Sequence, residues 1–148
     1  MYDNLTSSIL KEGIIGLNKT ISDESCRIIR EFIDDYDPKK SEINYGGSEK
    51  RIWNAEKICP EITEFARFSN EIVSAAKRRN MKCYSILAYQ NTPCDINKYG
   101  LGRWHCDSMR SQMKVFNFLK PVGLENGPLE ILSKTHSFFF IIHTITTF

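Results

Sequence analysis

The chain has 148 residues, which is enough for one domain with its own hydrophobic core. Its formal net charge is +2, with 20 basic and 18 acidic side chains, so we expect neither nucleic acid nor a membrane as its partner. The five cysteines include no Cys-x-x-Cys pair and the N-terminus has no secretory pattern, so we expect a cytoplasmic protein with reduced thiols.

The first 36 residues predict two helices separated by a strand. Residues 2–11 predict a short helix, and residues 13–17 predict a strand that enters the fold. The next helix begins at Ser22 or Asp23, either of which can cap its N-terminus, and runs to about Tyr36. It ends there because an Asp-Pro pair follows.

The middle of the chain predicts a loop and a long helix. Residues 38–49 are polar and contain the pair Gly46-Gly47, which indicates a flexible loop. Pro60 occupies a favourable first-turn position and opens a helix that runs to about Arg79.

The second half of the chain changes to a strand pattern. A turn is expected at 127–128, and strands are expected at 83–90, from His105, at 113–119 and at 129–132. Helices followed by strands predict an α+β fold.

The pair His105 and Asp107 is the strongest candidate for a functional site. Residues two apart on a strand extend from the same face, whereas Cys106 between them extends from the opposite face. An imidazole beside a carboxylate supplies two of the three ligands of the 2-His-1-carboxylate triad, which holds non-haem Fe(II). Taken alone, His105 would more often be a core or surface histidine than a ligand, and it is the surrounding sequence that favours a metal site at these two residues.

The surrounding sequence, residues 103–137, resembles the core of the phytanoyl-CoA dioxygenase-like family of Fe(II)/2-oxoglutarate oxygenases. The resemblance is carried, in order, by Trp104-His105-x-Asp107, Lys114, the run Glu-Asn-Gly-Pro-Leu at 125–129, and Thr-His-Ser at 135–137. It implies a double-stranded β-helix (jelly roll) with N-terminal helices packed on one sheet, formed by a single domain over residues 1–148.

The resemblance also implies Fe(II) as cofactor and 2-oxoglutarate as co-substrate, with a small organic or acyl substrate. Lys114 is the candidate to bind a carboxylate of 2-oxoglutarate, although its ammonium can equally extend into solvent. Gln90, with its neighbour Tyr89 on the preceding strand, is a second candidate for lining the same pocket.

The C-terminal part departs from the family pattern. Residues 133–136 read Ser-Lys-Thr-His where the family has Pro-Gly-Ser-His, and the family's distal His ligand and 2-oxoglutarate-binding Arg lie further downstream. Only 41 residues follow Asp107, whereas four strands with their turns need about 40 or more. We therefore expect an incomplete domain, ended by a premature stop or a frameshift. His143 is the candidate third ligand if the fold is abbreviated, and His136 is expected to be a structural loop residue.

Residues 138–148 are uncharged and mostly apolar, which agrees with a premature stop or a frameshift and also with a buried final strand. With two protein ligands the chain should hold iron weakly, so low or absent activity is expected. The alternative function is a non-catalytic jelly-roll or cupin-like domain that binds another metal through His105 and His136 or His143, or that binds a partner. An exposed sheet edge would then allow oligomerisation.

Overall fold

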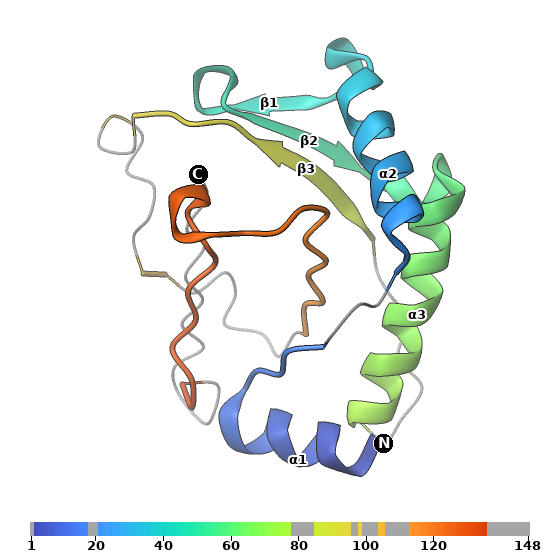
Figure 1. The fold of residues 1–148 in the computed structure, drawn as a ribbon, viewed down its shortest axis with the longest axis vertical. Helices are drawn as coiled ribbons and strands as arrows, with labels where there is room; N and C mark the ends of the chain where they lie inside the picture. Colours follow the sequence, from blue (N-terminus) through green and yellow to red (C-terminus); the bar gives the residue numbers. More distant parts are fainter. Residues whose placement is uncertain are drawn as a thin grey trace.

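The protein combines three α-helices with a three-stranded antiparallel sheet, so the predicted α+β class is confirmed (Figure 1). The computed structural model describes residues 2–17, 21–77, 85–95, 98, 104–105 and 113–135. The elements are α1 (Tyr2–Glu12), α2 (Asp23–Asp35), β1 (Glu42–Asn44), β2 (Glu49–Trp53), α3 (Pro60–Lys77) and β3 (Leu87–Asn91), with 3-10 turns at Pro38–Lys40, Tyr45–Gly47, Ala55–Lys57 and Leu124–Asn126.

Helix α2 follows the sequence prediction at both ends. The Ser22 hydroxyl caps it by accepting a hydrogen bond from the backbone N–H of Ser25 at 3.0 Å. Its C-cap, Tyr36, is extended, as expected for a helix that an Asp-Pro pair follows. One face carries Ile29 and Ile33, which are both buried and fix the side of the helix that packs on the sheet.

In the sheet, β2 lies between β1 and β3 and is antiparallel to both. Ile52 pairs with Ala88, and both pack with α2 and α3 in the main core. Because side chains alternate along a strand, Arg51 and Trp53 extend from the opposite face of β2. The helices thus cover one face of the sheet (Figure 1).

The core consists of two clusters. The main cluster joins α2, α3 and the sheet, and its buried members are Ile29, Ile33, Ile52, Ala55, Cys59, Ile62 and Ala88. The second cluster surrounds Ile72 of α3 and includes Ile9 of α1, Ile15, Phe68 and Met113. The segment 113–119 contacts both clusters, since Leu119 packs on the first and Met113 on the second.

Two predictions in the first half of the chain were wrong. Residues 13–17 form no strand: Gly13 ends α1 with a left-handed φ of 77°, and Ile15 then packs into the second cluster without a ladder partner. The predicted loop 38–49 instead contains β1 and the start of β2. Its polar composition concealed β1, which has three residues and lies at a sheet edge.

The predicted strands of the second half are only partly present. Residues 87–91 form β3, whereas residues 83–84 of the expected strand lie outside the described residues. Residues 113–119 form no strand and, in 129–132, Ile131 is an isolated bridge. A strand requires a hydrogen-bonded neighbour, so the apolar pattern at 113–119 is insufficient by itself. No helix in the described part of the chain is long and apolar enough to span a membrane.

Candidate functional site

The structure describes His105 but not its predicted partner ligands. His105 forms an isolated bridge and its side chain is exposed, next to Trp104, which is 49% exposed. Asp107 and His143 lie outside the described residues, as does His136. Within the described ranges, no three His, Cys, Asp or Glu side chains are grouped to hold a metal ion. The imidazole of His105 suits Fe(II) as one ligand, and the spatial relation of His105 to Asp107 stays a prediction.

Lys114 lies on an extended segment with strictly alternating exposure. The side chains of residues 113, 115, 117 and 119 are half-buried, and those of residues 114, 116, 118 and 120 are exposed. This period of two places Lys114 on the same face as Phe116 and Phe118. An exposed ammonium beside two aromatic rings is compatible with binding an anionic organic molecule, and the predicted role of Lys114 is untested.

The segment 113–119 is attached to the helical core at its C-terminal end. The Arg30 guanidinium on α2 donates a hydrogen bond from Nη1 to the carbonyl oxygen of Leu119 at 2.6 Å. The Leu119 side chain packs against the main core cluster. One polar contact and one apolar contact therefore determine where this end of the segment lies.

The Glu-Asn-Gly-Pro-Leu run at 125–129 has a clear structural basis. The side-chain oxygen of Asn126 accepts a hydrogen bond from the backbone N–H of Gly123 at 3.1 Å, which closes the 3-10 turn Leu124–Asn126. Gly127 follows with φ 62° and ψ 72°, in the left-handed region that favours glycine. Asn126 and Gly127 are thus the residue types that this turn requires, and Pro128 then leads the chain away from it.

The loop 133–135 is anchored to the C-terminal end of α1. The backbone N–H of Lys134 donates to the carbonyl oxygen of Glu12 at 2.8 Å, and the two side chains approach to 3.8 Å. The Thr135 hydroxyl donates to the carbonyl oxygen of Leu132 at 2.7 Å. These contacts give the segment before His136 a defined position against α1.

Gln90 lies on the helix-facing side of the sheet. Its side-chain amide donates to a carboxylate oxygen of Asp34 on α2 at 2.6 Å. Its neighbour across the sheet, Lys50, donates on the same side to the carbonyl oxygen of Ile33 at 2.6 Å. Tyr89 extends from the opposite face of β3. The structure therefore places Gln90 beside α2, and its proposed part in cofactor binding stays a prediction.

The face of the sheet opposite the helices carries a polar network that sequence reasoning missed. The Glu42 carboxylate accepts hydrogen bonds from the Asn44 amide and the Trp53 indole, both at 2.7 Å. These hydrogen bonds, together with Arg51 nearby, hold the pKa of Glu42 below its ordinary value. Arg51 also pairs with Glu49 at 2.7 Å. Residues 49–53 begin with three charged side chains and show no alternation of polar and apolar residues, so the sequence contained no strand signal there.

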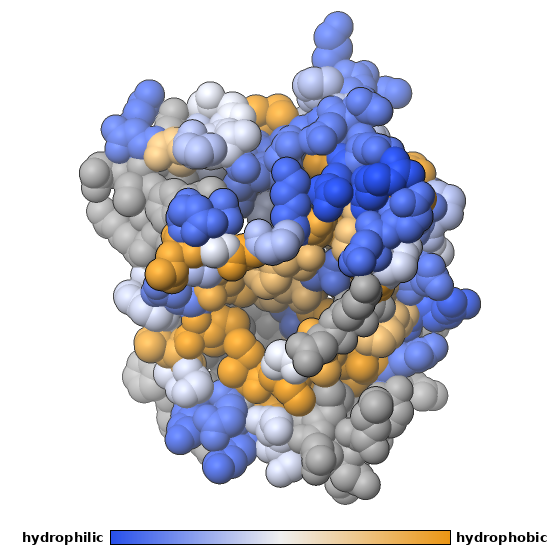
Figure 2. All heavy atoms as spheres, in the orientation of Figure 1, coloured by the Kyte–Doolittle hydropathy of each residue, from blue (hydrophilic) through white to orange (hydrophobic). Residues whose placement is uncertain are grey.

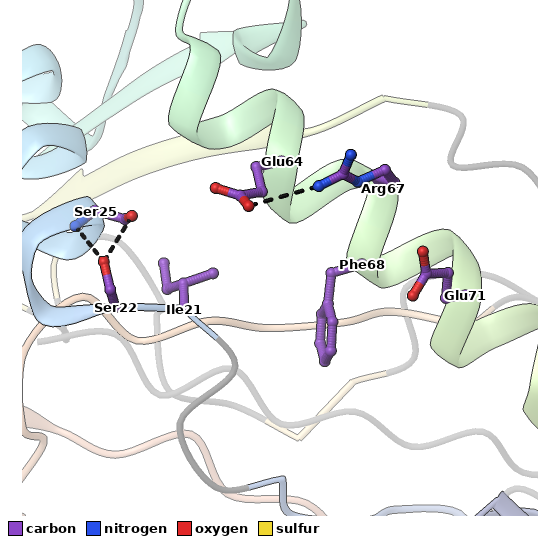
Figure 3. A pocket seen from close by; sticks show the side chains of 7 residues that line it. All are labelled: Ile21, Ser22, Ser25, Glu64, Arg67, Phe68 and Glu71. Carbon is purple, nitrogen blue, oxygen red and sulfur yellow. Dashed lines mark hydrogen bonds and ion pairs between the residues drawn. The ribbon is translucent and has the colours of Figure 1, made fainter.

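A cleft of about 740 Å³ lies between the start of α2 and the face of α3 (Figure 3). Its walls include Ser22, Ser25 and Phe68, and an ion pair between Glu64 and Arg67 at 3.6 Å. The two serine hydroxyls are 2.9 Å apart and bond to one another. Mixed charge and satisfied hydroxyls give this cleft no strong preference for one ligand class. No sequence motif pointed to it.

The buried thiol of Cys59 is not a candidate nucleophile. Burial raises its pKa, which keeps the thiol protonated and unreactive at neutral pH. Cys59 is a buried member of the main core cluster, so we interpret it as a packing residue.

No protein-family model, curated protein or solved structure matches this chain.

Proposed function

We propose that the chain belongs to the phytanoyl-CoA dioxygenase-like family and that its function is Fe(II)/2-oxoglutarate-dependent hydroxylation of a small organic or acyl substrate. The observation that carries the proposal is the ordered set His105, Asp107, Lys114 and the Asn-Gly-Pro turn. The turn adds support because its Asn126 and Gly127 fulfil specific backbone requirements, which chance residues at these positions would rarely do.

The finer fold belongs to the same proposal. In a double-stranded β-helix, the N-terminal helices cover the outer face of one sheet, and α2 and α3 cover one face of β1–β3 in the same manner. The extended segment 113–119 would then join this architecture as a further strand. The α+β order of elements supports this fold without specifying it.

The proposed roles of the residues follow from their chemistry. His105 and Asp107 hold Fe(II), with His143 as candidate third ligand, and Lys114 binds a carboxylate of 2-oxoglutarate by charge. The iron, with oxygen and 2-oxoglutarate, supplies the oxidation of a C–H bond. The task of the chain is to bind and orient the reactants beside His105.

Anaerobic Fe(II) titration, followed by equilibrium dialysis, tests the metal site. We expect weak but saturable binding, as for two protein ligands, that is lost in His105→Ala and in Asp107→Ala, whereas His136→Ala binds as the parent does. Loss of binding in His143→Ala would assign the third ligand to that residue. Equal iron binding by the parent and His105→Ala would show that the proposal is wrong.

A second measurement separates co-substrate binding from turnover. In anaerobic calorimetry, 2-oxoglutarate is expected to bind the iron-loaded protein, and Lys114→Met is expected to weaken this binding by about tenfold, as for loss of one charge-assisted contact. The matched control is Lys120→Met, which removes an exposed lysine from the end of the same segment. Succinate formation in air then reports whether the bound complex reacts.

A further inference from the structure

Arg30 on α2 holds a backbone group that lies 89 positions further along the chain. Its guanidinium donates a hydrogen bond from Nη1 to the carbonyl oxygen of Leu119 at 2.6 Å, and the contact is partly buried. A hydrogen bond from a charged donor is stronger than a neutral one, and partial burial strengthens it further because water competes less. Arg30 therefore holds one end of the segment 113–119 against the helical layer.

Arg27, about one turn earlier on the same helix, makes a different kind of contact. Its guanidinium pairs with Glu24 and Glu31, both at 2.6 Å, and all three side chains are exposed. Such pairs between residues three or four positions apart stabilise a helix slightly and fix nothing outside it. Arg30 is half-buried and contacts a distant segment, so the two arginines differ in what they hold.

The segment 113–119 is held at both ends. Met113 packs on the second core cluster, and Leu119 packs on the main one. Figure 1 draws the chain of residues 113–135 between α1 and the sheet, and Figure 2 shows apolar side chains gathered in this middle part of the molecule. A chain fixed at two points has fewer conformations than a chain fixed at one. Holding Leu119 therefore also restricts the residues between the two ends, including Lys114.

We propose that Arg30 is a positioning residue for the 2-oxoglutarate site: by holding Leu119, it keeps the segment in the conformation in which Lys114 binds a carboxylate of the co-substrate. This inference rests on the proposed function, because it takes Lys114 as the co-substrate ligand. Arg30 acts through the segment and binds no reactant itself. A group that is ordered before binding loses less entropy on binding, so Arg30 contributes to the affinity for 2-oxoglutarate.

Anaerobic calorimetry of the iron-loaded full chain with 2-oxoglutarate tests this role. Arg30→Met is expected to weaken binding by about threefold to tenfold, as for the ordering of roughly one flexible side chain on binding. Arg30→Lys keeps a charged donor for the Leu119 carbonyl and is expected to retain most of the affinity. The matched control is Arg27→Met, which removes the exposed ion pairs with Glu24 and Glu31 and is expected to bind as the parent does.

A double-mutant cycle separates positioning from a general loss of structure. If Arg30 acts through Lys114, Arg30→Met weakens binding in the parent and has no further effect in Lys114→Met, because the side chain that it positions is already gone. The same loss of affinity in both backgrounds would show a merely structural role and overturn the inference. Urea denaturation confirms that each variant is folded during the titration. Arg30→Gln, which keeps a shorter, neutral donor, replaces Arg30→Met in the cycle if Arg30→Met does not fold.

The parent and the single variants distinguish failure of the inference from failure of the proposed function. If the parent does not bind 2-oxoglutarate, the proposed function is wrong, and the inference with it. If the parent binds and Lys114→Met binds more weakly, whereas Arg30→Met binds as the parent does, the proposed function stands and the positioning role is wrong. Unchanged binding in Lys114→Met, or equal weakening in Arg27→Met and Arg30→Met, would also overturn the inference.

Discussion

The sheet with its covering helices and the segment 113–135 differ in how their side chains are held. In the first region Ile52 is 1% exposed and is enclosed by α2, α3 and β3. In the second region the apolar side chains Phe118 and Leu124 are 54% and 90% exposed. Lys114, a candidate co-substrate ligand, thus lies in a described region whose apolar side chains are more exposed than those of the sheet and its helices.

The largest effect is expected from removing the central side chain of the first region. Ile52→Ala leaves a cavity between the sheet and the helices and should lower the free energy of unfolding by about 3–4 kcal/mol. The control Ile43→Ala changes a 46% exposed isoleucine on the neighbouring strand and should change stability by less than about 0.5 kcal/mol. Urea denaturation measures both. Equal losses of stability in the two variants would contradict the view that Ile52 belongs to a packed core and Ile43 to an exposed edge.

The next effect concerns the hydrogen bond that connects the two regions. Arg30→Met loses the contact with the carbonyl oxygen of Leu119 and should lower the free energy of unfolding by about 1–2 kcal/mol. Amide hydrogen exchange of residues 113–120 should also become faster. Arg27→Met is the control, because its partners Glu24 and Glu31 are exposed on the same helix. If Arg27→Met lowers the free energy of unfolding as much as Arg30→Met does, the hydrogen bond between the two regions contributes no more to stability than an exposed ion pair.

A smaller effect is expected in the turn of the second region. Gly127→Ala forces a side chain into a left-handed backbone with φ 62° and should lower stability by about 1 kcal/mol, whereas Gly127→Asn should cost less. Gly16→Ala is the control, since an added Cβ meets no atom within 4 Å there. Thermal unfolding compares the three variants. Unchanged stability in Gly127→Ala would mean that this turn adapts to an ordinary backbone.

The smallest effect is the titration of Glu42 on the face of the sheet opposite the helices. Its folded pKa is lowered chiefly by the Asn44 hydrogen bond and then by that of Trp53. A lowered pKa stabilises the fold above the pKa of the unfolded chain, and this contribution is lost as pH falls through the folded pKa. Carboxylate titration by NMR should show the pKa rising toward its ordinary value in Asn44→Ala and, to a smaller extent, in Trp53→Phe. An unchanged pKa in both variants would contradict the hydrogen-bond assignment.

The helices were predictable because their signals are local. The cap at Ser22, the apolar spacing of Ile29 and Ile33 and the first-turn Pro60 all act within a few residues, and α2 and α3 begin where those signals place them. The sheet was less predictable because a strand depends on its partner. β1 escaped prediction since it is short and two of its three residues, Glu42 and Asn44, are polar. Residues 113–119 were predicted as a strand, although the structure gives them no ladder.

The candidate site likewise combines features that the sequence predicted with features that depend on contacts between distant residues. His105 and Asp107 were singled out by a spacing that places both side chains on one face of a strand, and Lys114 by the family resemblance. The structure adds the alternating exposure around Lys114 and places the Gln90 amide beside α2. Nothing in the spacing of Gln90 could have indicated Asp34, which is 56 residues away in sequence.

The sequence alone determined the α+β class, the starts of helices α2 and α3, and the choice of His105 and Asp107 as metal-ligand candidates, because these depend on residue type and short-range spacing. Tertiary structure alone decided the strand order β1-β2-β3, the face of the sheet that the helices cover, and the exposure of Phe116 and Phe118. These features depend on contacts between residues that are distant in sequence, and hydrophobic burial and strand pairing become defined only when those residues meet.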